Sequence, residues 1–161
     1  MAHIHEKIDF TVSVCIVHDN KVLLHKHKKL GIWLAPGGHI ELDEDPIQAV
    51  IREAKEETAL DIELVGTASS YDTPYSAREL IVPKFLNRHF FDESHTHEHV
   101  DLCYFARSKS ADARPEIEGG EIKWFDKEEL EENSYGIIED VRTHSLAALK
   151  ELAPPSRRAS S

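Results

Sequence analysis

Cysteine and long apolar runs are both scarce in this sequence. Among 161 residues only Cys15 and Cys103 are cysteines, and both lie in alternating apolar stretches, which favours buried free thiols over a disulfide. No apolar run reaches the length of a membrane span. The N-terminal stretch, MAHIHEKIDF, lacks the apolar core of a signal peptide. We therefore expect a cytoplasmic protein that does not bind a membrane.

Positive charge is also in short supply. Lysine and arginine number 19 against 30 aspartates and glutamates, for a formal net charge of -11. A surface that acidic repels polymeric nucleic acid, so a protein that coats DNA or RNA is excluded. A small anionic ligand is still compatible with this charge if a metal ion bridges the repulsion.

The apolar pattern predicts one α/β domain over residues 1–152, followed by a disordered tail over 153–161. Strands alternate with two main helices, and Asp126 and Glu129 mark the start of a short helix between them. A loop is expected over 71–84, where Pro74 and Pro83 interrupt regular structure. The expected strands cover 8–18, 21–27, 61–70, 84–93, 99–108 and 121–126, and the final helix lies within 134–152.

The first main helix has the clearest boundaries. Asp45 is a candidate N-cap, Pro46 suits the first helical position and Gln48 completes a capping box. The spacing of the apolar positions predicts one buried face and leaves the three glutamates of REAKEE off it. The expected buried positions are Ile47, Val50, Ile51, Ala54 and Thr58.

The glutamates Glu53, Glu56 and Glu57 stand at helical neighbour spacing, where like charges repel. A solvated helix face is the ordinary explanation of such a cluster. Here PGGHIE precedes the helix, and its paired glycines allow a ligand or an ion to approach the backbone closely. Several carboxylates together with a backbone carbonyl form the oxygen ligand set that Mg²⁺ or Mn²⁺ requires, and a diphosphate is the natural partner of such an ion.

Residues 38–60, GHIELDEDPIQAVIREAKEETAL, resemble the Nudix box. The box has a glycine, a glutamate six residues later, and then Arg-Glu followed by Glu-Glu at fixed spacing. Six polar and glycine positions match, which chance produces about once in 10⁷ start positions. Ala59 stands where the family has glycine, and Ala54 is small for an aliphatic position, but neither change removes a ligand. The matching positions are Gly38, Glu44, Arg52, Glu53, Glu56 and Glu57.

The resemblance implies a Nudix-type α/β/α sandwich with a mixed β-sheet and a loop-helix-loop catalytic box. It implies that Glu56 and Glu57 are the principal metal ligands, with Glu53 as a further ligand or as a base for water. The backbone carbonyl of Gly37 or Gly38 would supply another oxygen. Arg52 would orient a glutamate and Glu44 would hold Arg52. The general base is left open between Glu53, Glu57 and a carboxylate of a later loop.

A histidine-rich stretch, HTHEHVD over 95–101, is the second unusual feature. In an extended chain His95, His97, His99 and Asp101 point one way, with spacing that would suit Zn, Ni or Cu, and a polar loop is the alternative. Many Nudix proteins have an extra acidic ligand or base near here, for which Glu98 and Glu93 are the candidates. Asp101 is expected to look toward the substrate side.

Three basic side chains close to the glycine turn are candidate substrate contacts: Lys26, Lys28 and His39. The predicted partner is a small nucleotide-like diphosphate, with Mg²⁺ or Mn²⁺ as cofactor, and a homodimer is left open. The expected reaction is hydrolysis of a nucleoside triphosphate to monophosphate and pyrophosphate. A nucleotide-sugar or ADP-ribose pyrophosphatase is the alternative, and an inactive nucleotide-binding module is the alternative of another class.

Overall fold

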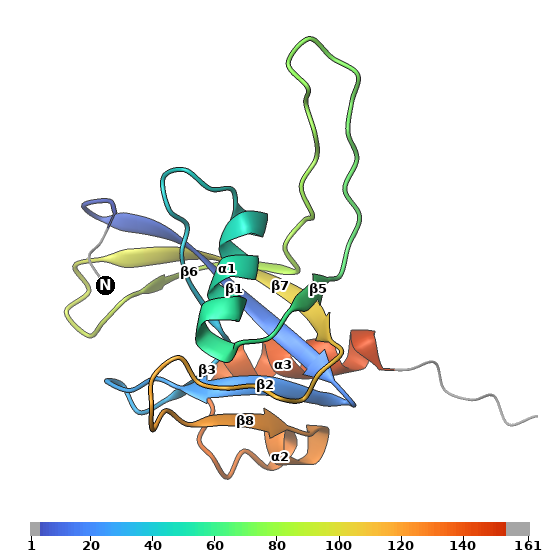
Figure 1. Ribbon diagram of the computed structural model, residues 1–161. Coiled ribbons are helices and arrows are strands. Elements are labelled where there is room, and N and C mark those ends of the chain that lie inside the picture. Colours follow the sequence, from blue (N-terminus) through green and yellow to red (C-terminus); the bar gives the residue numbers. More distant parts are fainter. Residues whose placement is uncertain (1–3, 154–161) are drawn as a thin grey trace, which may run out of the picture.

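A mixed β-sheet forms the centre of the molecule (Figure 1). The computed structural model describes residues 4–153, and eight strands of that part join one sheet with the central order β3-β2-β1-β7-β5. Strand β1 (Ile8–His18) pairs in parallel with β7 (Glu98–Ser108), and every other strand pair is antiparallel. The predicted mixed sheet is confirmed.

The remaining strands are short and extend the sheet from β1, β2 and β7. Strands β2 and β4 both pair with β1, β3 and β8 pair with β2, and β5 and β6 pair with β7. The turn between β1 and β2 is made by Asp19 and Asn20, both at positive φ (45° and 59°), as expected for a tight hairpin turn. The bounds are β2 Lys21–Lys26, β3 Trp33–Leu34, β4 Gly37–His39, β5 Ile62–Leu64, β6 Phe85–Phe90 and β8 Ile122–Phe125.

Helices cover both faces of this sheet (Figure 1). Helix α1 (Pro46–Thr58) packs on Val12, Val14 and Ile16 of β1, whereas α3 (Glu139–Leu152) packs on the other face over Cys15 and Cys103. Both cysteines are buried free thiols, as predicted. Because both faces are covered, β1 and β7 are buried along most of their length.

Two expected elements differ most in their bounds. The strand predicted over 61–70 covers only Ile62–Leu64, because Gly66 at φ +145° takes the chain away from the sheet. Residues 65–84 then form a long excursion that stands off the sheet (Figure 1). The final helix begins at Glu139, five residues later than the predicted range, because the side chain of Asn133 bonds both backbone groups of Ile137 (2.8 and 3.0 Å) and holds a turn there.

The other predicted helix starts are confirmed. Asp126 caps α2 (Lys127–Glu132) with Glu129 in a capping box. Across residues 4–153, no helix combines the length and apolar character needed to cross a bilayer. The predicted tail lies almost entirely outside the described residues, since only Ala153 of 153–161 falls within them.

Candidate active site

The N-terminus of α1 is fixed by its cap, which sets the direction of every side chain on the helix. The Asp45 carboxylate accepts from the backbone N–H groups of Ile47 (2.8 Å) and Gln48 (2.9 Å), and Gln48 returns a bond to the Asp45 N–H. Val50 and Ala54 are fully buried against the sheet. With these residues on the sheet, Glu53 and Glu57 turn toward β4 and the glycine turn.

The three glutamates do not all look outward, which corrects the sequence prediction. Glu53 is 4% exposed and the Glu57 side chain 19%, while the Glu56 side chain is 51% exposed. Ile51, expected on the buried face, is 45% exposed. The apolar spacing missed this because the backbone of β4, not a side-chain core, covers this edge of the helix.

The backbone of β4 can lie against α1 because residue 38 is a glycine. A Cβ atom built at Gly38 would lie 2.3 Å from Oε1 of Glu53, which is closer than any real contact. At Gly37 a Cβ would meet the Val12 carbonyl oxygen of β1 at 2.1 Å. Both glycines are therefore required where β4 is wedged between β1 and the carboxylates of α1.

Glu57 carries a charge that its surroundings do not fully compensate. Its Oε2 accepts from the Gly37 N–H at 2.8 Å and lies 3.6 Å from Nε2 of His25 on β2. Burial, together with the carboxylates of Glu53, Glu116 and Glu56, raises the pKa of Glu57 to about 8 despite the Gly37 bond, which lowers it. A bound cation would relieve this desolvation and repulsion.

Arg52 forms hydrogen bonds with three of the carboxylates at this site. Its Nε and Nη2 donate to the two carboxylate oxygens of Glu44 (3.1 and 2.5 Å), and its Nη1 donates to Glu53 (2.8 Å) and Glu56 (3.2 Å). Nη2 also donates to the backbone carbonyl of His39 at 3.1 Å. The contacts that the resemblance implies for Arg52 are present, and the guanidinium holds the pKa of Glu44 below its usual range.

The donor set fits a hard divalent cation. Glu53 lies against Gly38 and Glu57 against Gly37, and Arg52 joins the Glu53 and Glu56 carboxylates, so one turn of α1 presents carboxylate oxygens of the type that such a cation binds. A metal-ligand role for the carbonyl of Gly37 or Gly38 stays a prediction.

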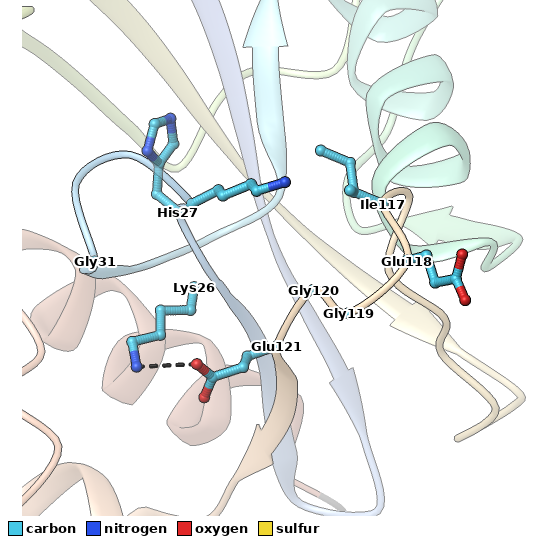
Figure 2. Close-up of a pocket in the computed structure, with 9 residues that line it drawn as sticks. Lys26, His27, Gly31, Ile117, Glu118, Gly119, Gly120 and Glu121 are labelled. Atoms are coloured by element: carbon cyan, nitrogen blue, oxygen red, sulfur yellow. Dashed lines mark hydrogen bonds and ion pairs between the residues drawn. The ribbon is translucent and has the colours of Figure 1, made fainter.

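A pocket of about 290 Å³ lies between the end of β2 and the loop before β8 (Figure 2). Lys26 and Lys28 line it, immediately after His25, which contacts Glu57. The Lys26 Nζ lies 3.0 Å from Oε1 of Glu121 on the opposite wall. The full lining is Lys26, His27, Lys28, Gly31 and residues 117–121.

Among the described residues, no contact links Glu98 to the glutamates of α1. It is the first residue of β7, and Arg88 of β6 donates to both of its carboxylate oxygens at 2.5 and 2.6 Å. This ion pair lowers the pKa of Glu98. A paired carboxylate of lowered pKa is a poor general base.

The structure also separates Asp101 and the side chain of His39 from the carboxylates. Asp101 accepts from the hydroxyls of Thr11 (2.8 Å) and Ser13 (2.6 Å) on the α3 side of the sheet. His39 is paired opposite Thr11, so its side chain shares that face, while Gly38 meets Glu53 on the α1 face. The expectation that Asp101 looks toward the substrate side is corrected, because the helix carboxylates lie on the other face.

Sequence reasoning missed His25 and Glu116. His25 shares a sheet face with Leu23, which packs under α1, so the alternation of β2 would have pointed to it once that face was known. Glu116 reaches the surroundings of Glu57 from the loop before β8, and the sequence has no local signal for this.

Comparison with known proteins agrees with this geometry. The model of the NUDIX domain matches residues 8–146. A crystal structure of a NUDIX-family hydrolase from Clostridium perfringens superposes with a TM-score of 0.78 at 38% identity, covering 89% of this chain and 97% of that one.

Two curated relatives have named substrates. An ADP-ribose pyrophosphatase of Methanocaldococcus jannaschii is 40% identical over 66 residues, covering 39% of each chain. A CTP pyrophosphohydrolase of Escherichia coli is 28% identical over 97 residues, covering 58% of this chain and 72% of the relative.

Proposed function

This chain belongs to the Nudix family of hydrolases, which act on pyrophosphate bonds, and from that premise we propose that its substrate is a nucleoside diphosphate linked to another group. A nucleoside triphosphate, cleaved to monophosphate and pyrophosphate, is the first choice. The observation that carries this proposal is the packing of Glu53 against Gly38 and of Glu57 against Gly37, with Glu56 joined to Glu53 through Arg52, in surroundings where burial and repulsion favour a cation.

We assign the metal to Mg²⁺, with Mn²⁺ as a substitute, held by Glu53, Glu56 and Glu57. When bound, the ion supplies charge neutralisation for the phosphate oxygens and makes a water more acidic. Arg52 keeps the carboxylates of Glu53 and Glu56 aimed at one place, and Glu44 holds Arg52. The Gly37 N–H orients Glu57.

The base that accepts the proton of the attacking water is proposed to be a helix carboxylate, Glu53 or Glu57. Both have raised pKa values, and burial is the first cause in each case. A carboxylate of raised pKa is better matched to proton transfer near neutral pH. The paired Glu98 lacks this property.

The pocket between the end of β2 and the loop before β8 is proposed to hold one end of the substrate. Lys26 and Lys28 are proposed to contact its phosphates, although Glu118 and Glu121 of the same lining offset their charge and Lys26 is paired with Glu121. A volume of about 290 Å³ is near the lower limit for small-molecule sites and suits part of a nucleotide. Substrate roles for His39 and Asp101 are not proposed again, since their side chains lie on the other face of the sheet.

The two curated relatives support different substrates. The Escherichia coli relative is named for CTP, which supports a triphosphate, and the archaeal relative is named for ADP-ribose, which supports the second candidate. An inactive binding module is disfavoured because the full set of glutamates is kept together. The two buried free thiols support a cytoplasmic location, and a homodimer stays a prediction.

A substrate screen tests the proposal. The protein is incubated with Mg²⁺ and nucleoside triphosphates, ADP-ribose, nucleotide sugars or dinucleotides, and the products are separated by chromatography. We expect nucleoside monophosphate and pyrophosphate from a triphosphate. Cleavage of ADP-ribose or a nucleotide sugar alone would favour the second candidate, and no hydrolysis of any of them would contradict both.

A further inference from the structure

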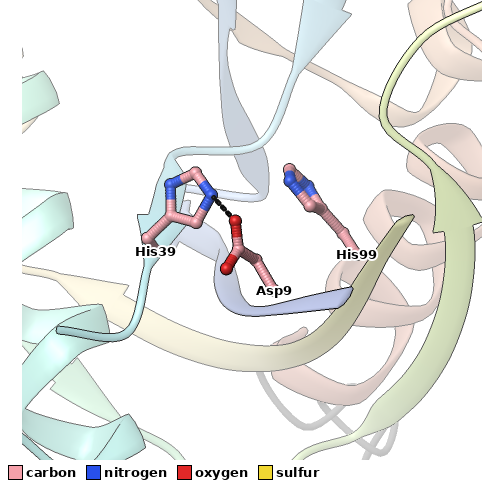
Figure 3. Close-up of side chains that lie close together, drawn as sticks. All are labelled: Asp9, His39 and His99. Atoms are coloured by element: carbon pink, nitrogen blue, oxygen red, sulfur yellow. Dashed lines mark ion pairs between the residues drawn. The ribbon is translucent and has the colours of Figure 1, made fainter. Parts of the chain in front are cut away.

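A second group of metal-ligand side chains lies on the α3 face of the sheet, away from the helix carboxylates. Asp9 of β1 and His99 of β7 are direct partners in the parallel strand pair, and His39 of β4 is paired with Thr11, two residues after Asp9. Three strands thus bring these side chains to the same face (Figure 3). Each of them offers one ligand atom, and the three atoms lie within 4.8 Å of one another.

Asp9 is the centre of this group and is held firmly. Its side chain is fully buried, and the backbone N–H groups of Ile4 (3.1 Å) and His5 (2.7 Å) donate to its Oδ1. The other oxygen, Oδ2, faces two imidazoles, with Nε2 of His39 at 3.1 Å and Nε2 of His97 at 3.0 Å. The Ile4 N–H also lies 3.3 Å from Oδ2, so the backbone orients the whole carboxylate while Oδ2 faces the histidines.

The spacing and the ligand types fit a transition metal better than Mg²⁺. Ligand bonds of roughly 2.0–2.1 Å at tetrahedral angles put neighbouring ligand atoms about 3.3 Å apart, close to the 3.1 Å between Asp9 Oδ2 and His39 Nε2. Imidazole nitrogens suit Zn²⁺, Ni²⁺ or Cu²⁺, whereas Mg²⁺ prefers oxygen.

We propose that Asp9, His39 and His99 bind one divalent transition-metal ion, Zn²⁺ being the best fit, at a site separate from the helix carboxylates. His97 is a positioning residue, since its Nε2 holds the Asp9 carboxylate and its Nδ1 lies 3.3 Å from the Glu6 carbonyl oxygen. Of the HTHEH stretch, His97 and His99 contribute to this site, whereas His95 is exposed and stacks on Phe90.

The site is connected to the catalytic turn through His39. The side chain of His39 contacts Asp9, while its backbone carbonyl accepts from Arg52, which in turn holds Glu44, Glu53 and Glu56. An ion bound by the His39 imidazole would link β4 to β1 and β7. Its expected role is structural: it stabilises the strand from which the glycine turn arises.

Metal analysis of the full-length, untagged protein tests this proposal. Protein loaded with Zn²⁺ is dialysed against a buffer that contains excess Mg²⁺ and is analysed for bound zinc. We expect one zinc per chain in the wild type and in Glu57→Gln, which alters only the carboxylate site. Asp9→Asn, which keeps the side-chain shape, and His99→Gln should each weaken zinc binding about 100-fold or more.

The matched control is His95→Asn, in the same histidine-rich stretch. His95 has a φ of 54°, a conformation that asparagine tolerates, so this variant should fold and keep its zinc. Circular dichroism checks the fold of each variant. The visible absorption of Co²⁺-loaded wild type gives a measurement that needs no variant, and a spectrum of four-coordinate cobalt with nitrogen ligands is expected.

Three results would overturn the proposal. If the wild-type protein holds no zinc after dialysis, the three side chains form only a hydrogen-bonded or protonated group and bind no metal. Equal zinc retention in Asp9→Asn and His99→Gln would remove these residues as ligands. Loss of zinc in Glu57→Gln with retention in Asp9→Asn would place the ion on the helix carboxylates.

Discussion

Arg52 uses the whole fork of its guanidinium at the candidate active site. It donates to the carboxylates of Glu44, Glu53 and Glu56 and to the carbonyl of His39. A lysine ammonium is a point charge with no planar fork, so it cannot reach all of these acceptors at once. Arginine at this position sets the directions of the carboxylates as well as balancing their charge.

Replacement of Arg52 by lysine should therefore lower kcat about 10- to 100-fold with a small change in KM, because the carboxylates lose their alignment. Steady-state kinetics with Mg²⁺ measure both parameters. Arg114→Lys is the matched control, since Arg114 is exposed and pairs with Asp112. An unchanged kcat in Arg52→Lys would show that charge alone is sufficient.

In contrast to Arg52, Glu98 is expected to contribute little to turnover. Its carboxylate is paired with Arg88 at the start of β7. Glu98→Gln should keep activity within about twofold, because exposed substitutions typically cost under ~0.5 kcal/mol. A hundredfold fall in turnover at unchanged melting temperature would instead place Glu98 beside the metals.

The pKa of Glu57 predicts a pH dependence of the metal-free protein. Its folded-state pKa, about 8, lies above the ordinary value of 4.5. The stability that it contributes is present below pH 4.5 and is lost as the pH rises through 8. The groups that face it are Glu53 and Glu56 on α1, Glu116 on the loop before β8, His25 on β2 and the Gly37 N–H on β4.

Thermal unfolding in a chelator at pH 6 and at pH 9 measures this dependence. The melting temperature of the wild type should fall more between these values than that of Glu57→Gln, which has no titrating group at this position. Parallel pH profiles of the two proteins would contradict the assigned environment of Glu57.

At the scale of the elements, α1 ends in an unfavourable conformation. Ala59 has φ 60° and ψ 7°, and its N–H bonds the Lys55 carbonyl. The Nudix box has glycine at this position, and glycine adopts this conformation without the penalty of a Cβ atom. The alanine keeps the helix end in place but strains it.

Ala59→Gly should stabilise the protein by about 1 kcal/mol, which for a domain of this size raises the melting temperature by roughly 2–4 °C. Scanning calorimetry measures the change, and turnover should stay near that of the wild type. A lower melting temperature would mean that the gain in unfolded-state freedom outweighs the relieved strain.

The sequence predicted elements well where one local interaction sets the boundary. The capping boxes at Asp45 and Asp126 are confirmed, as is the turn at Asp19 and Asn20. Boundaries set by tertiary contacts were not predictable, such as the turn that Asn133 holds before α3. For the same reason Glu53 was wrongly predicted to face outward, since its burial depends on the backbone of β4 lying against the helix.

At the scale of the whole molecule, the two faces of the sheet separate two kinds of ligand. The α1 glutamates lie on one face and the Asp9–His39–His99 group on the other, with His39 contacting Asp9 through its side chain and Arg52 through its backbone. The sequence could indicate both groups by their motifs. It could not assign Asp9 and His39 to the histidines, because only the pairing of β1, β4 and β7 brings them together.

Mg²⁺ should stabilise the whole fold because it binds the folded state and relieves carboxylate repulsion. At a free concentration 100 times Kd the gain is about 2.7 kcal/mol, or roughly 5–10 °C in melting temperature. The shift should be smaller in Glu57→Gln. A wild-type melting temperature that does not change in saturating Mg²⁺ would contradict binding at the carboxylates.

The most direct test of the central claim, that the carboxylates of α1 carry the hydrolysis, is the turnover number of Glu57→Gln with Mg²⁺ on the best substrate of the screen. Glutamine keeps the size of the side chain and loses the charge, so the variant should fold. We expect a fall in kcat of about 100-fold or more, since lost charge stabilisation costs several kcal/mol of barrier. Turnover near the wild-type rate in a folded Glu57→Gln protein would contradict the account.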